Sequence, residues 1–256
     1  MFAGSYCGSP PALAEIASHW NFDPPLVAVL GVAWVLALRS RSRMAAGGVS
    51  LLTLAFVSPL CAASVSLFSA RSIHHLLLIA AALAFALAAR SPGAVSSPFK
   101  LRLPVSLTTL TMTGALWAWH VPALYNAALA NIALYWGMQI TIFATSFAFW
   151  LAIQRAGVMG AIGGLLGGMV QMGFLGALLT FASKPLYVTH ALSAPSWGLT
   201  GLADQQLAGL VMWVGGMAPF ALGGFWIARR AWHGQNGAEN STNSKNVLCE
   251  LQAKRQ

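Results

Sequence analysis

Seven apolar segments, each close to the length that crosses a lipid bilayer, constrain this chain most. They cover about residues 25–38, 47–69, 73–89, 104–121, 132–153, 158–182 and 204–228. A spanning helix needs about 20 mostly apolar residues, and only helices and closed barrels satisfy the backbone in lipid. Of the 256 residues, 57% are hydrophobic and 7% are charged, against about 25% charged in a soluble domain. The sequence predicts an all-α polytopic membrane protein, a seven-transmembrane-helix bundle. Only Ala70, Arg71 and Ser72 separate the second and third segments, which predicts a tight helical hairpin.

The positive charges predict the orientation of this bundle, because cytoplasmic loops carry an excess of Lys and Arg. With the N-terminus outside, all of the 14 basic residues except Arg71 and Lys184 fall on the inner side. We therefore expect the N-terminus outside and the C-terminus in the cytoplasm. The chain then divides into an outer segment (1–24), a seven-helix membrane domain (25–232) and a disordered cytoplasmic tail (233–256). The basic residues that give the net charge of +9 lie between the apolar segments. They therefore indicate membrane topology and not a nucleic-acid partner.

This orientation gathers most of the histidines on the outer side of the membrane. They are His19, His74, His75, His120 and His190, and Asp204 lies at the same level. Ionisable side chains at the membrane ends of helices are costly to bury, so they usually have a function. Imidazole binds copper, zinc and haem iron. We expect metal ligands among His75, His120, Asp204 and His190, with His190 in an outer loop. Adjacent helical residues point about 100° apart, so we expect His75 to face the bundle and His74 the headgroups or the loop.

Two further expectations concern Asp204 and the cysteines. Asp204 has an alternative role as the cap of the seventh helix, because an aspartate near a helix N-terminus accepts from free N–H groups. Met212 follows it by eight residues, or about 12 Å of helix, so the two cannot bind one ion. Cys7, Cys61 and Cys249 form no CxxC pair, and we expect neither a disulfide nor a thiolate metal site.

Four stretches together resemble a known family of membrane proteins. They read HHLLLIAAAL from His74, WAWHVPALYNAAL from Trp117, KPLYVTH from Lys184 and DQQLAGLVMWVGG from Asp204. Over roughly residues 20–230 the chain is similar to the CtaG family of cytochrome c oxidase (caa-type) assembly factors. The most specific stretch is the last, and the residues that match its motif are Asp204, Gln205, Gln206, Gly209, Met212 and Trp213. The chain departs from the family at Arg71 and near Tyr135, Trp136 and Gln139, where histidines are frequent.

The resemblance implies an assembly factor in the bacterial inner membrane, with its N-terminal segment in the periplasm and oxidase subunits as partners. Its expected role is to handle copper for the oxidase, with His75, His120 and Asp204 holding or passing the ion. The sequence has no recognisable nucleophile–base pair, phosphate loop or paired carboxylates, so we predict a protein that is not an enzyme. The alternatives are a b-type haem protein with His75 and His120 as axial ligands, a metal or solute permease, and a scaffold without metal.

Overall fold

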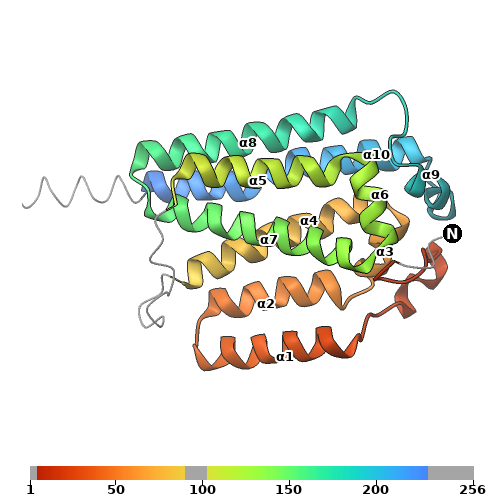
Figure 1. Ribbon diagram of the computed structural model, residues 1–256, viewed down its shortest axis with the longest axis horizontal. Helices are drawn as coiled ribbons and strands as arrows, with labels where there is room; N and C mark the ends of the chain where they lie inside the picture. The colour runs from red at the N-terminus through yellow and green to blue at the C-terminus, as the bar shows by residue number, and fades with distance from the viewer. Residues whose placement is uncertain (1–4, 90–102, 230–256) are drawn as a thin grey trace, which may run out of the picture.

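The computed structural model describes residues 5–89 and 103–229, and every regular element within them is helical (Figure 1). The α-helices are α1 (Pro24–Arg39), α2 (Arg43–Phe56), α3 (Leu60–Ser66), α4 (Phe68–Ala88), α5 (Val105–His120), α6 (Pro122–Ala130), α7 (Ile132–Arg155), α8 (Val158–Thr180), α9 (Val188–Ser193) and α10 (Gly201–Leu210). Two 3-10 helices, η1 (Leu13–Ser18) and η2 (Ala194–Trp197), join them. The all-helical prediction is confirmed for these residues. The predicted tail, 233–256, lies outside them.

Polar side chains mark where several of these helices begin. Ser42, Asn131 and Thr200 each stand one residue before a helix and accept a hydrogen bond from the backbone N–H three residues later. Each satisfies one of the N–H groups that a first helical turn leaves without a partner. The starts of α2, α7 and α10 are therefore set by the local sequence.

The described helices include four that are long and apolar enough to cross a membrane. They are α4, α7, α8 and the last helix, which runs from Gly201 to Arg229 through a π-helical turn, η3 (Val211–Gly215). The bent pair of α2 and α3 makes a fifth if it is one span. Helices α1 and α5 stand at the other two predicted segments but have 16 residues each. Four or five spans follow from length and composition, and the count of seven stays a prediction.

The connection between the second and third segments differs from the predicted hairpin. The segment expected at 47–69 is bent by 48° between α2 and α3, next to Pro59, which has no N–H to continue the helix. The chain then turns at Leu67, which is extended (φ −122°, ψ 135°). Arg71 is therefore not a loop residue: it lies in the first turn of α4 and is fully buried.

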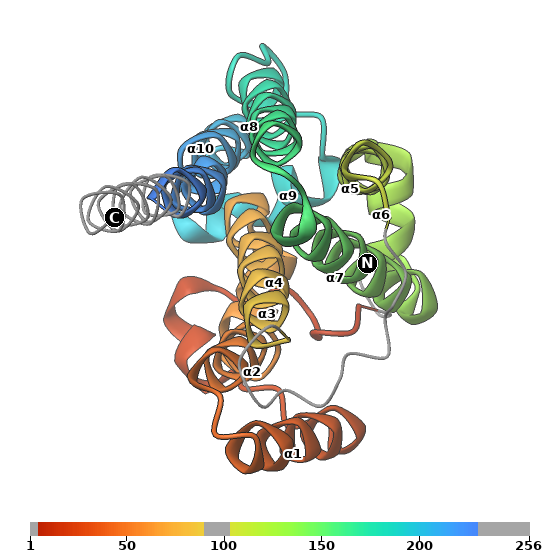
Figure 2. The same cartoon turned by 90° about the vertical axis from the view of Figure 1, so that its left-hand side faces the viewer.

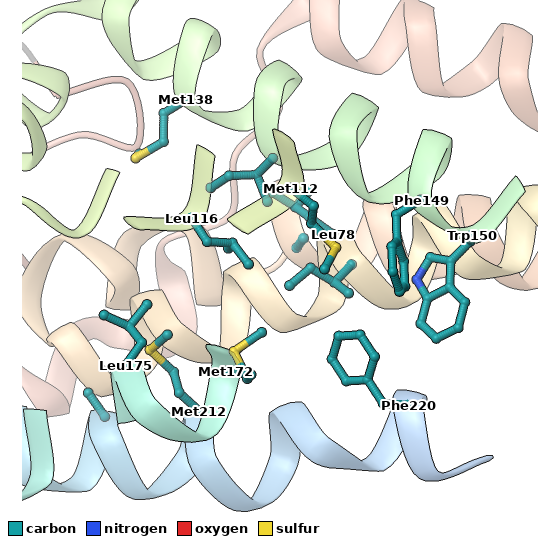
Figure 3. Packing of buried hydrophobic residues seen from close by; sticks show 14 of the residues in the cluster. Leu78, Met112, Leu116, Met138, Phe149, Trp150, Met172, Leu175, Met212 and Phe220 are labelled. Atoms are coloured by element: carbon teal, nitrogen blue, oxygen red, sulfur yellow. The ribbon is translucent and has the colours of Figure 1, made fainter. Parts of the chain in front are cut away.

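Helix α4 lies at the centre of the bundle when the molecule is viewed end-on (Figure 2). It packs against α2, α3, α7 and α10, whereas α1 packs on the outer side of α2. Below its polar first turns, α4 contributes Leu78 to an apolar core (Figure 3). There Phe220 of the last helix packs on Phe149 and stacks on Trp150 of α7, at ring-centroid distances of 5.9 and 5.5 Å. Met212 is buried in the same core.

The two ends of the bundle carry different chemistry. One end holds η1, α3, α6, α9 and the start of α4 (Figure 1), and with them His19, His74, His75, His120 and His190. We call it the histidine end. The other end holds the α1–α2 turn, the end of α7 and the end of the last helix, with Arg39, Arg41, Arg43, Arg155 and Arg229. We call it the arginine end. The five histidines therefore lie at one end of the bundle, and the outer side of the membrane stays a prediction for that end.

Candidate functional site

The first two turns of α4 carry three buried ionisable side chains. Arg71, His74 and His75 are 0%, 0% and 3% exposed, since α4 has neighbouring helices on several sides. The expectation that His74 faces the headgroups or the loop is wrong, because its ring packs edge-on against Phe56 of α2 at 4.9 Å. Both histidines face protein. None of the ring nitrogens of His74 and His75 has a hydrogen-bond partner among the described residues.

His75 meets His120, the last residue of α5. Their ring centroids lie 5.8 Å apart with an interplanar angle of 79°. Nδ1 of His120 lies 2.6 Å from the backbone oxygen of Leu116. Because a carbonyl oxygen only accepts, Nδ1 carries the proton, and Nε2 of the neutral ring keeps its lone pair. That Nε2 is buried and has no partner within the described chain.

The separation of the two rings is compatible with one shared metal ion. Two imidazoles that bind one ion at a metal–nitrogen distance of about 2.0 Å have ring centroids about 4.5–6.3 Å apart, depending on the angle between the two bonds. A second-shell carbonyl that fixes the tautomer, as the Leu116 oxygen does for His120, is common around metal-binding histidines. Residues 5–89 and 103–229 contain no group of three or more His, Cys, Asp or Glu side chains placed to hold a metal. The site therefore offers two protein ligands.

Asp204 does not belong to the histidine pair but binds the start of α4. Its Oδ2 accepts from the backbone N–H of Phe68 at 2.6 Å, and its Oδ1 accepts from the N–H and the hydroxyl of Ser69 at 3.1 and 2.5 Å. The carboxylate is fully buried and caps the N-terminus of α4 from another helix. The helix that contains it is capped by Thr200. Asp204 is a helix cap, as the alternative role predicted, but it caps α4 and not its own helix.

The rest of the Asp-Gln-Gln motif holds the chain between α8 and α9. Gln205 is buried, and its Oε1 accepts from the N–H of Leu186 at 2.6 Å while its Nε2 donates to the backbone oxygen of Leu179 at 3.4 Å. Gly209 faces α8 so closely that a Cβ there would lie 2.6 Å from the backbone oxygen of Gly176. Gln206 is half-buried. This stretch therefore fastens the last helix to α4, to α8 and to the segment after α8.

Trp213 and Met212 complete the motif inside the π-helical turn. Met212 is 3% exposed and packs in the core, whereas half-buried Trp213 meets Phe181 edge-on at 6.0 Å and packs on Gly176. A π-helical turn shifts the register of the side chains that follow it. Both residues contribute contacts between the last helix and the α8 region.

His190 lies in α9, a short helix within the connection between α8 and the last helix, and it is 1% exposed. Its Nε2 lies 2.6 Å from the hydroxyl oxygen of Tyr125, which is on α6. The Phe68 ring packs against both His120 and His190, with centroid distances of 6.1 and 5.7 Å. The hydroxyl of Tyr187 donates to the backbone oxygen of His120 at 2.7 Å. His190 therefore supports the surroundings of the His75–His120 pair without joining it.

Burial and charge keep this supporting layer neutral. Burial, together with the positive charge of Arg71, lowers the pKa of His190 from 6.5 to about 3. Burial raises the pKa of the Tyr125 and Tyr187 hydroxyls above their ordinary value. At neutral pH these three side chains carry no charge, and they hydrogen-bond as neutral groups.

Acidification is expected to destabilise the protein through His190. Between pH 6.5 and 3 the unfolded chain binds a proton at this residue and the folded protein does not, so stability falls as the pH drops. At about 1.4 kcal/mol per pH unit, the loss from pH 7 to 5 is about 2 kcal/mol. Thermal unfolding in detergent at both pH values should show a smaller acid-induced loss in His190→Gln than in the parent. An equal loss in both would contradict this assignment.

The sequence marked Arg71 as a departure from the family, four residues before His75, but placed it in a loop and did not predict its burial in this site. Its guanidinium lies over the ring of Tyr135 on α7, 5.4 Å from the ring centroid, which is a cation–π arrangement. The four-residue spacing was the signal, because it puts Arg71 and His75 on the same helical face once both belong to one helix.

The cysteine prediction is corrected by a disulfide. Cys7, before η1, is bonded to Cys61 in α3, 54 residues later. The expectation of no disulfide rested on the absence of local cysteine motifs. Cysteines this far apart in the sequence meet only because the N-terminal segment folds back over α3. The Sγ of Cys7 also lies 3.4 Å from the hydroxyl oxygen of Tyr135. The disulfide therefore stands beside the ring that Arg71 covers.

Comparison with known proteins gives one result. No curated protein and no solved structure matches the chain. The family model described as cytochrome c oxidase caa3 assembly factor matches residues 31–233, which include α4, the His75–His120 pair and the whole Asp-Gln-Gln motif. The resemblance drawn from the four sequence stretches is thereby confirmed. This chain belongs to the CtaG family of cytochrome c oxidase caa3 assembly factors.

Proposed function

We propose that the chain is a seven-span bundle of the bacterial inner membrane whose histidine end faces the periplasm. The Cys7–Cys61 disulfide supports this orientation, because such bonds persist in oxidising compartments and are rare in the cytosol. Five arginines at the arginine end support it independently. Helix α1 reaches only about 24 Å by itself, but it exposes Val29, Val32 and Leu36. We assign these side chains to contact with lipid.

We propose further that the protein is a non-enzymatic factor that holds or passes copper while an oxidase is assembled, with oxidase subunits as its partners. The observation that carries this proposal is the His75–His120 pair, with its centroids 5.8 Å apart and the lone pair of the His120 Nε2 unused within the described chain. Copper here is the cargo. Imidazole is a good copper ligand, and a site with two protein ligands leaves positions for a recipient to take over the ion.

Copper titration of the purified protein tests the proposal. His75→Ala and His120→Ala should each weaken binding at least tenfold, because each removes one of two ligands. The matched control is His19→Ala, since His19 is also at the histidine end but bonds through its Nδ1 to the backbone oxygen of Glu15. Unchanged binding in both pair variants would exclude the site. An absorbance scan of the same sample tests the haem alternative, which requires a Soret band.

Oxidase activity in a strain that lacks the protein tests the physiological role. The parent chain should restore activity, and the His75→Ala/His120→Ala double variant should not. Restoration by a well-folded double variant would contradict the copper role and favour the scaffold alternative, in which the protein binds an oxidase subunit without metal.

A further inference from the structure

The N-terminal segment crosses the histidine end as an external strap. We define the strap as residues 5–23. Its helix η1 has no buried residue, although Ile16 packs against the buried cluster that contains Ala63 and Leu67. The backbone oxygen of Pro11 accepts from the Ser66 hydroxyl and from the Trp197 indole N–H, both at 2.9 Å. Near its other end, Asn21 donates its backbone N–H to Val57 at 2.9 Å. The covalent attachment is the Cys7–Cys61 bond.

The side chain beside this bond covers the polar first turns of α4. The ring of Tyr6 stacks on Tyr135 at 5.1 Å, and Tyr135 carries Arg71 on its ring. Tyr6 also meets Trp136 edge-on at 4.9 Å. Through these contacts the strap lies over the part of α4 that contains Arg71.

A second series of ring contacts leads from the strap to a histidine. Trp136 stacks on Phe56 at 5.4 Å, and Phe56 packs against His74 at 4.9 Å. His74 and His75 are 0% and 3% exposed, and on the side of the strap they lie behind Phe56, Trp136 and Tyr6, which form this covering. The covering is fastened by the Cys7–Cys61 bond, which a thiol can break and an oxidant can restore.

The two sulfurs differ in their surroundings. Cys7 is half-buried, whereas Cys61 is 0% exposed. Each sulfur has a donor nearby, since the side-chain amide of Asn21 donates to the Sγ of Cys61 at 3.8 Å and the Tyr135 hydroxyl lies 3.4 Å from the Sγ of Cys7, so exposure is what distinguishes them. An incoming thiolate therefore reaches Cys7, and Cys61 is the sulfur that leaves.

We propose that the Cys7–Cys61 bond is a thiol–disulfide exchange site for a dithiol partner, and that its reduction releases the strap and opens the histidine end. A partner thiolate attacks the Sγ of Cys7 and forms a mixed disulfide, and the electron pair of the broken bond goes to Cys61. The second thiol of the partner then attacks the mixed disulfide and displaces Cys7. The partner leaves as a disulfide, and both cysteine thiolates take up protons.

Histidine accessibility tests the opening without any metal, so its result is independent of the copper proposal. Full-length protein carrying Cys249→Ser is treated with diethyl pyrocarbonate in its oxidised, reduced and re-oxidised forms, and modification is mapped by mass spectrometry. Added N-acetylhistidine reports the reagent dose in each sample. Reduction should raise the labelling rate of His74 and His75 at least tenfold, and re-oxidation should reverse the rise. Equal rates in the oxidised and reduced forms would overturn the proposal.

Two controls separate opening from unfolding and locate the attack. Cys7→Ser/Cys61→Ser protein should label at the fast rate with or without reductant, and circular dichroism should show unchanged helix content in reduced parent protein. Loss of helix on reduction would contradict a local opening. Brief treatment of oxidised protein with glutathione followed by acid quenching should leave the adduct on Cys7. An adduct on Cys61 would contradict the proposed direction of attack.

Discussion

Asp204→Ala is expected to lower the free energy of unfolding by about 3–5 kcal/mol, because the carboxylate is buried and every contact it makes supports another helix. The substitution removes three hydrogen bonds and leaves the N–H groups of Phe68 and Ser69 buried without an acceptor. It also removes the buried carboxylate close to the first turn of α4, where the positive charge of Arg71 lies. Thermal or denaturant unfolding in detergent measures the effect.

Two smaller substitutions at the same contact serve as controls. Asp204→Asn keeps one acceptor oxygen and should lose about half as much stability. Ser69→Ala removes only the hydroxyl bond to Oδ1 and should cost about 1 kcal/mol. The copper affinity of Asp204→Asn should follow its stability, because the carboxylate positions α4 and does not contact the His75–His120 pair. A folded Asp204→Ala protein with parental stability would show that the cap is dispensable.

The sequence predicted the helices well where the signal was local. Apolar length marked the positions of α4, α7, α8 and the last helix, and Ser42 and Thr200 are capping residues of ordinary type. It failed at Leu67, where an extended residue separates α3 from α4. No glycine or proline stands at that position, so nothing in the local sequence announces the turn. Placing Arg71 in a loop followed directly from this error.

The candidate site could be predicted by residue type and by its place at one end of the bundle, but not by contact. His75 and His120 were named as ligands and do lie side by side. The partners of Asp204 are more than 130 residues away in the sequence, and no local pattern encodes them. The same holds for the disulfide, whose two cysteines are 54 residues apart. Motif spacing detects ligands that one short segment contributes, and this site is assembled from α4, α5, α6 and α9.

Gly209→Leu is expected to be the most damaging single substitution, with a loss of more than about 5 kcal/mol or no folded protein at all. The Cβ position of Gly209 lies 2.6 Å from both the backbone oxygen of Gly176 and the backbone nitrogen of Thr180. These atoms belong to helix α8 and cannot rotate away, so a side chain forces α8 and the last helix apart. Glycines that allow such close approach are typical of helix pairs in membranes.

The separation would also act on the distant histidine pair, because Asp204 is on the same helix as Gly209 and caps α4. Moving that helix withdraws the carboxylate from Phe68 and Ser69, so the first turns of α4 lose their cap together with the α8 contact. Gly163→Leu is the matched control, since a Cβ at Gly163 of α8 meets no atom of another described segment within 4 Å. That variant should stay within about 1 kcal/mol of the parent in the same detergent unfolding assay. If Gly209→Leu and Gly163→Leu have the same free energy of unfolding, the contact between α8 and the last helix does not hold the site in place.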